Sequence, residues 1–170
     1  MPDVPPIVIR ALSESDAEIF RPLRLRALRE EPESFSMSPE ESGTVEKLEN
    51  SDESFILGAF TPELVATVGF FRHKGRKSRH KGSVWGVYVA PEARGQGLAR
   101  KLMVALIARA STIPDLEQLT ISVATINEAA QRLYLSLGFK SYGIEPRALK
   151  IEGRYLDEQF LSLRLDHSVP

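Results

Sequence analysis

The chain has 170 residues, of which 42% are hydrophobic, and it carries no cysteine and a formal net charge of −1 at pH 7. This length fits one folded domain, so we expect a single domain over residues 1–170 with a core spanning roughly 7–165. The absence of cysteine excludes disulfides, thiolate metal sites and a cysteine nucleophile. Without a long apolar run or a basic-then-apolar leader, the sequence predicts a cytoplasmic protein that does not enter a membrane.

The charges are distributed unevenly along the chain. Six Lys or Arg and no acid lie within residues 72–81, whereas residues 30–54 carry nine acids opposed only by Lys47. We interpret the basic segment as a solvated hairpin loop, with steering of an anionic cofactor or nucleic-acid contact as alternatives. Because no aromatic residue interleaves these bases, the sequence does not favour nucleic acid as a partner.

Hydrophobic periodicity and turn residues predict an α/β chain. The expected elements, in chain order, are a strand at 7–12, a helix from 13 toward 30, a short helix around 44–50, hairpin strands at 55–60 and 65–71, a strand at 83–89, a helix at 97–110, a strand at 119–124, a helix at 128–137, and strands at 139–144 and 160–165. The strand, helix, strand order over 84–124 requires a right-handed crossover, so those two strands should be parallel neighbours in a mixed sheet.

Several residues mark the ends of the predicted helices. Ser13 and Asp16 match a capping box, and Pro22 is expected to kink the first helix or to start its second half. Asn127 fits the N-cap of the helix at 128–137, which Gly138 would end.

Residues 84–99 predict an anion site, because an apolar strand and a short turn lead to two glycines that open a helix. Gly95 and Gly97 lack a Cβ, so a phosphate can approach the unpaired N–H groups of the helix N-terminus. Arg94 would add a charged donor. A Walker loop is absent, and a dinucleotide fingerprint would need glycine at the position of Arg100.

Two spaced motifs resemble those of the GNAT superfamily of N-acetyltransferases. The pattern Arg94-x-x-Gly97-x-Ala99 is similar to the family's pyrophosphate loop. The second motif follows about thirty residues later and is similar to the family's Asn-x-x-Ala-x-x-x-Tyr helix with a Gly-Phe exit; its residues here are Asn127, Ala130, Tyr134, Gly138 and Phe139. With both motifs in this order, the chain is identified as a member of that superfamily.

The resemblance implies the GNAT fold, an α/β (α+β) arrangement with a mixed, mostly antiparallel central sheet flanked by helices. In that fold one parallel strand pair splays apart, aided by a bulge, and the pantetheine arm of acetyl-CoA lies in the wedge. Gly86 either marks this bulge or makes room for a neighbour.

The resemblance also implies direct transfer of the acetyl group of acetyl-CoA to a primary amine of a small molecule or protein, without a metal. Homodimers are common in the superfamily. A non-catalytic acyl-CoA-binding sensor is the alternative function. The residues expected to contact the cofactor are Val87, Tyr88, Val89, Arg94, Gly95, Gln96, Gly97, Leu98, Ala99, Arg100, Asn127 and Ala130.

Tyr134 is the expected general acid for the departing thiolate. Its reference pKa of about 10 keeps the phenol protonated at neutral pH. Periodicity alone favours core packing for this side chain, whereas the family motif implies the catalytic role. In the same way, Asn127 would contact the cofactor, cap the helix, or do both.

The general base is less clearly marked. Family members that resemble protein N-terminal acetyltransferases carry Glu five residues before the motif Asn, where this chain has Ser122. A base is therefore expected elsewhere, with Glu158 assigned as catalytic; the other candidates are Glu40, Glu41, Asp157 and His80, the last of which fits a solvated loop equally well.

Three residues are candidates for the pocket that binds the acceptor amine. Glu41 and Asp157 are expected to bind the acceptor, and Trp85 would form the pocket floor or else a buried core residue. The acidic stretch over 30–54 suggests a cationic acceptor, such as a polyamine, an aminoglycoside-like amine or a lysine.

Overall fold

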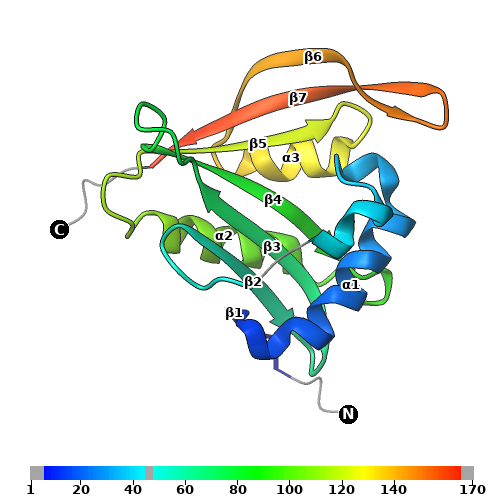
Figure 1. The fold of residues 1–170 in the computed structure, drawn as a ribbon, viewed down its shortest axis with the longest axis vertical. Coiled ribbons are helices and arrows are strands. Elements are labelled where there is room, and N and C mark those ends of the chain that lie inside the picture. The colour runs from blue at the N-terminus through cyan, green and yellow to red at the C-terminus, as the bar shows by residue number, and fades with distance from the viewer. Residues whose placement is uncertain (1–5, 45–47, 166–170) are drawn as a thin grey trace.

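The computed structural model describes residues 6–44 and 48–165. Seven strands form one sheet in the order β1-β2-β3-β4-β5-β7-β6 (Figure 1). The strands are β1 (Val8–Ala11), β2 (Ser54–Phe60), β3 (Leu64–Arg72), β4 (Lys81–Val89), β5 (Gln118–Ala124), β6 (Lys140–Ile151) and β7 (Arg154–Arg164). The α-helices are α1 (Ala17–Glu30), α2 (Leu98–Ala110) and α3 (Glu128–Ser136), and short 3₁₀ turns lie at Glu14–Asp16, Pro32–Ser34, Pro39–Thr44 and Pro91–Ala93. Only the β4–β5 pair is parallel among the strand pairs of this part of the chain.

The helices cover both faces of the sheet. Side chains of α2 and α3 pack with one set of strand residues in the main core, which includes Phe70, Leu102 and Tyr134. On the opposite face, α1 packs against the alternate residues of the same strands, such as Ile56 and Tyr88. Successive side chains of a strand point to opposite faces, so β2 and β4 contribute to both layers.

The β4–β5 pair opens soon after it begins. Only Lys81–Ser83 of β4 pair with Gln118–Thr120 of β5. Farther along β4, residues 86 and 87 stand opposite the single residue Val68 of β3, because Thr67 pairs with Tyr88 and Gly69 with Trp85. Gly86 adopts a positive φ of 63° in this bulge. The expected bulge and the expected splayed pair are both confirmed.

The junction between β1 and α1 contains the predicted capping box. Asp16 accepts hydrogen bonds from Ser13 N at 2.8 Å and from both terminal nitrogens of Arg10. This box opens a 3₁₀ turn rather than the α-helix itself, which starts at Ala17. The helix continues through Pro22 to Glu30, so Pro22 does not begin a separate helix.

Two expected elements need correction. Around 44–50, the 3₁₀ turn ends at Thr44, residues 45–47 lie outside the described part, and Leu48 and Glu49 are not helical. Leu48 instead inserts into the core beneath α1, and its N–H donates to Glu14 Oε2 at 3.0 Å.

The last two strands are much longer than 139–144 and 160–165. They form a hairpin that turns at Glu152–Gly153 and extends beyond the rest of the sheet (Figure 1). The sequence pattern hid this length because β6 is an exposed edge strand with a bulge after Glu145, so its apolar residues do not alternate.

The basic segment forms the connection between the antiparallel strands β3 and β4, as expected for a hairpin loop. Arg72, its first residue, is buried and donates to the carbonyl oxygens of Arg79 at 2.7 Å and Pro114 at 3.0 Å. Arg79 in turn pairs with Glu53. Part of the charge therefore stabilises the loop itself. Among the described residues, no helix is long and apolar enough to cross a membrane.

Candidate active site

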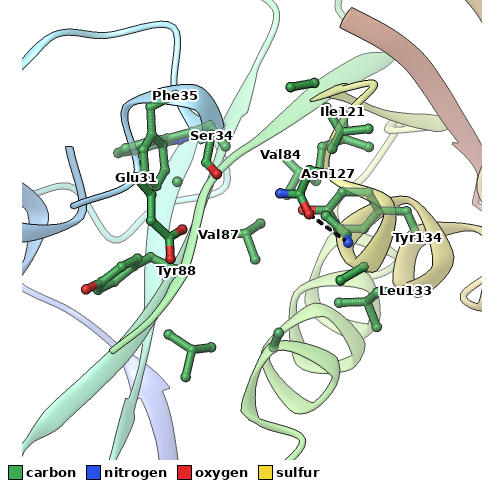
Figure 2. A pocket seen from close by; sticks show the side chains of 18 of the residues that line it. Glu31, Ser34, Phe35, Val84, Val87, Tyr88, Ile121, Asn127, Leu133 and Tyr134 are labelled. Atoms are coloured by element: carbon green, nitrogen blue, oxygen red, sulfur yellow. Dashed lines mark hydrogen bonds between the residues drawn. The ribbon is translucent and has the colours of Figure 1, made fainter. Parts of the chain in front are cut away.

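A cavity of about 790 Å³ opens where β4 and β5 separate. Its walls come from α1 and the turn after it, from β4 and the loop before α2, and from β5, α3 and β7. Figure 2 shows Phe35 and Ser34 on one side of β4 and Asn127 and Tyr134 on the other. The bulged strand therefore passes between two halves of one cavity.

The glycine-opened helix lies at one end of this cavity. Gly95 and Gly97 both have positive φ, 80° and 69°, and a Cβ added at either would meet no atom within 4 Å. The first helical hydrogen bond of α2 runs from Lys101 N to Gly97 O at 3.0 Å. The N–H groups before it have no acceptor within the helix, and the helix dipole adds positive potential there. This open cradle suits a phosphate group.

Arg94, the expected charged donor, lines the cavity and also bonds within the protein. Its Nε donates to Val89 O at 3.1 Å, and its Nη2 pairs with Glu31. Arg100 donates to Ser136 Oγ and so links α2 to α3. Ten of the twelve residues predicted to contact the cofactor line the cavity, and Gln96 and Arg100 are the two that do not.

The open edge of β4 provides backbone donors. Ala90 N donates to Val65 O at 2.8 Å, toward β3. Because N–H directions alternate along a strand, the N–H groups of Val87 and Val89 point the other way, into the wedge. The Tyr88 side chain points toward α1, where its hydroxyl donates to Glu30 Oε2 at 3.0 Å. The Tyr88 hydroxyl is therefore engaged at α1 and does not compete for the backbone donors of β4.

On the other wall, α3 presents Asn127 and Tyr134. Asn127 Oδ1 accepts from Ala130 N at 3.1 Å, so the predicted N-cap is confirmed (Figure 2). Tyr134 is 5% exposed and packs against Phe139, yet it also lines the cavity. Its hydroxyl has no hydrogen-bond partner among the described residues, and burial raises the pKa of the phenol above its ordinary value.

Glu158 reaches the cavity from β7. It pairs with Ala124 of β5, and its Oε1 accepts from Ser122 Oγ at 3.5 Å. Burial raises the pKa of the Glu158 carboxyl, the Ser122 hydrogen bond opposes this rise, and the cross-strand neighbour Glu145 adds to it. Ser122 stands five positions before Asn127, where some family members carry Glu. In this protein the Glu158 carboxylate of the adjacent strand β7 lies next to Ser122. Strand register brings these two groups together, and the sequence alone does not specify register.

The other predicted acceptor and base residues separate into two groups. Trp85 lines the cavity, with its indole packed over Gly69. Asp157 instead accepts from Arg147 N at 2.8 Å and holds the β6 bulge, and Glu41 accepts from Ser38 N at 2.7 Å. Neither of these two carboxylates lines the cavity, and neither do Glu40 and His80.

The sequence did not predict the buried cation of the cavity wall. Arg24 of α1 is 7% exposed and lines the cavity, with its guanidinium 4.8 Å from the ring centroid of Phe35 and 5.2 Å from that of Trp85. It occupies the apolar stripe of α1 together with Phe20 and Ala27. The sequence signal for this residue was an arginine at a core-facing position of an amphipathic helix, where cations are rare.

The model of the acetyltransferase (GNAT) family matches residues 18–139. The chain belongs to this family. The Salmonella typhimurium protein yncA, solved with its cofactor acetyl-CoA, is 22% identical and superimposes with a TM-score of 0.78 over 97% of this chain and 98% of that one. The expected GNAT fold, with its mixed, mostly antiparallel sheet, is therefore confirmed.

Two curated relatives match a shorter part of the chain. An L-methionine sulfoximine/L-methionine sulfone acetyltransferase of Pseudomonas paraeruginosa is 38% identical over 80 residues, 47% of this chain and 46% of that protein. A spermidine N(1)-acetyltransferase of Vibrio cholerae is 33% identical over 78 residues, 46% of this chain and 45% of that protein. The matched segment thus spans less than half the length of either relative.

Proposed function

We propose that this GNAT protein transfers the acetyl group of acetyl-CoA directly to a primary amine of a small molecule. The observation that carries the proposal is the cavity between the separated strands, which joins the glycine-lined N-terminus of α2 to Tyr134 and Glu158. Membership of the family supports the reaction class. The names of the two relatives support a small acceptor, an amino-acid derivative in one and a polyamine in the other.

The residues present fit acetyl-CoA. The N–H groups from Gly95 to Arg100 would bind the diphosphate, because the two glycines leave the backbone open. The Val87 and Val89 N–H groups would pair with the pantetheine arm and the thioester carbonyl. The Asn127 amide, whose oxygen caps α3, lines the same wall and would reach the pantetheine or phosphate arm.

Bound acetyl-CoA supplies the acetyl group as an activated thioester. Glu158 would take the proton that the amine nitrogen loses as its bond to the acetyl carbon forms, and its raised pKa makes it a stronger base than an exposed carboxylate. Tyr134 would give its hydroxyl proton to the sulfur as the carbon–sulfur bond breaks. Burial of the Tyr134 side chain raises the pKa of the phenol, so the hydroxyl stays protonated at neutral pH, as an acid in this role must.

Isothermal titration calorimetry with acetyl-CoA, NAD and ATP tests the binding step. We expect dissociation in the micromolar range for acetyl-CoA and no comparable heat for NAD or ATP. Thiol release from acetyl-CoA in the presence of primary amines then tests the transfer. Binding without release for any amine would favour the acyl-CoA sensor, and a folded protein that binds no acetyl-CoA would contradict both functions.

A further inference from the structure

We propose that Arg24 binds a carboxylate of the acceptor, so that the acceptor is a zwitterionic amine of the amino-acid type. This inference rests on the proposed function and names the substrate class of the same cavity. It starts from a cation that is buried at the cavity wall and forms no ion pair with any residue that the structure describes.

Two nitrogens of the Arg24 guanidinium are buried without a hydrogen-bond partner among the described residues. These atoms, Nε and Nη1, are fully buried and make no hydrogen bond with residues 6–44 or 48–165, although arginine nitrogens are strong donors. Nη1 lies 3.6 Å from the position a Cβ would take on Gly86, beside the bulge of β4. Burial lowers the pKa of Arg24 to about 10, so the side chain is still a cation at neutral pH.

The acidic residues near α1 are already engaged elsewhere. Glu30 pairs with Arg26, Glu31 with Arg94, and Glu33 with Arg154. Within the described residues, no ion pair involves Arg24. These three carboxylates are therefore paired with arginines other than Arg24. The cationic acceptor that the acidic stretch suggested is the alternative that the test below compares with an amino acid.

Burying a charge without a partner costs free energy, and a bound ligand of opposite charge would offset that cost. Arg24 Cζ lies 4.8 Å from the ring centroid of Phe35 and 5.2 Å from that of Trp85, so both rings pack on the guanidinium. A guanidinium is a planar group that can bind a carboxylate through two hydrogen bonds. An acceptor that carries only positive charges would instead meet a like charge in a site of low dielectric. A carboxylate at Arg24 and an amine toward Glu158 would place each charge of the acceptor beside a cavity residue of opposite charge.

Three variants and matched acceptors test the proposal. Arg24→Met keeps the aliphatic length without the guanidinium, Arg24→Lys keeps the charge without the fork, and Arg29→Met removes an exposed arginine from the same helix as a control. The acceptors are L-methionine and L-methioninamide, L-phenylalanine and L-phenylalaninamide, and 1,4-diaminobutane. The measurement is kcat/KM for each acceptor at saturating acetyl-CoA.

We expect Arg24→Met to lower kcat/KM for the two carboxylate acceptors by about 10- to 100-fold, the worth of a charged hydrogen bond, with little change for the amides. Arg24→Lys should retain part of the preference, and Arg29→Met should behave as wild type. Comparing each variant with wild type cancels the intrinsic difference in basicity between the acid and its amide. The dissociation constant of acetyl-CoA should stay the same in all three variants.

Thermal unfolding gives a second measurement that does not depend on turnover. With acetyl-CoA present, L-methionine should raise the Tm of wild type and leave that of Arg24→Met unchanged. Equal losses for acids and amides, or a wild type that prefers the diamine, would overturn the role of Arg24. If acetyl-CoA binds but neither amino acid is acetylated, the acceptor class is wrong while the acetyl-CoA site stands. If acetyl-CoA does not bind, the proposed function fails as well.

Discussion

At the scale of single residues, the proposed chemistry depends on one phenol and one carboxylate that line the cavity from different elements. Tyr134 comes from α3 and Glu158 from β7, and both are held by packing or by a strand register rather than by each other. Each can therefore be removed without disturbing the other, which makes their roles separable by experiment.

Tyr134→Phe tests the general acid. The substitution keeps the ring that packs on Phe139 and removes only the hydroxyl. We expect turnover to fall by about 10²- to 10⁴-fold, the usual contribution of a positioned acid, while the dissociation constant of acetyl-CoA changes little. Tyr142→Phe, an exposed tyrosine of β6, serves as the control in the same thiol-release assay. A turnover unchanged in Tyr134→Phe would reject the acid role.

Glu158→Gln tests the general base through pH dependence. The base acts only when deprotonated, and burial raises the pKa of Glu158. An ordinary glutamate has a pKa near 4.5. Wild-type kcat/KM should therefore rise with pH through an apparent pKa above that value. The variant should lose about 100-fold in kcat/KM and lose this acidic limb. An identical acidic limb in the variant would assign the titration to another group.

At the scale of elements, two short segments connect sequence to function: the glycine turn before α2 and the capping box before α1. The first forms the anion cradle, and the second fixes the helix that carries Arg24. A substitution in each segment can be compared with the same kind of substitution outside it.

Gly97→Val should abolish measurable binding of acetyl-CoA by calorimetry. A side chain here would occupy the open space above the N–H groups of α2, in addition to the strain of φ 69°. Gly153→Val is the matched control, because Gly153 also has a positive φ, 81°, and open space but lies in the β6–β7 turn. If both variants bind acetyl-CoA equally well, the cradle is not the phosphate site.

Asp16→Asn should lower the free energy of unfolding by about 1 kcal/mol near pH 7. The Arg10 hydrogen bonds lower the pKa of Asp16 to about 2, below its unfolded value of 3.8, so this contribution is present above pH 3.8 and disappears as pH falls toward 2. Solvent exposure of Arg10 screens the pair and limits the effect. Urea unfolding at pH 7 and pH 2.5 measures it, with the exposed Glu18→Gln as control; an equal difference at both pH values would contradict the assignment.

The elements also differ in how far the sequence predicts them. Local signals were sufficient where one residue decides, as at the Asn127 cap and the α2 start at Gly97. The bulge at Gly86 was expected from the family resemblance, because a glycine alone also fits a close neighbour. Local signals failed for the β6–β7 hairpin, because an exposed edge strand needs no apolar alternation. They also failed for Arg24, whose burial depends on rings from the turn after α1 and from β4, far apart in the sequence.

At the scale of the whole molecule, the splay divides the sheet into two parts. Strands β1 to β4 form one and β5 to β7 the other, and between them only three residue pairs of β4 and β5 continue the ladder. The core of α2 and α3 spans the gap on one face (Figure 1). A ligand that pairs with β4 and also contacts α3 would therefore add contacts that the protein alone lacks.

Hydrogen–deuterium exchange of the whole protein tests this arrangement. Saturating acetyl-CoA should slow exchange in peptides covering 87–100 and 127–134, on both sides of the wedge, because binding to the native state suppresses local opening. The tip of the β6–β7 hairpin, residues 147–155, should exchange at its original rate. Gly97→Val should show no protection in any peptide. Protection limited to one side of the wedge would mean that acetyl-CoA does not bridge the two parts of the sheet, and the proposed placement of its pantetheine arm would then be wrong.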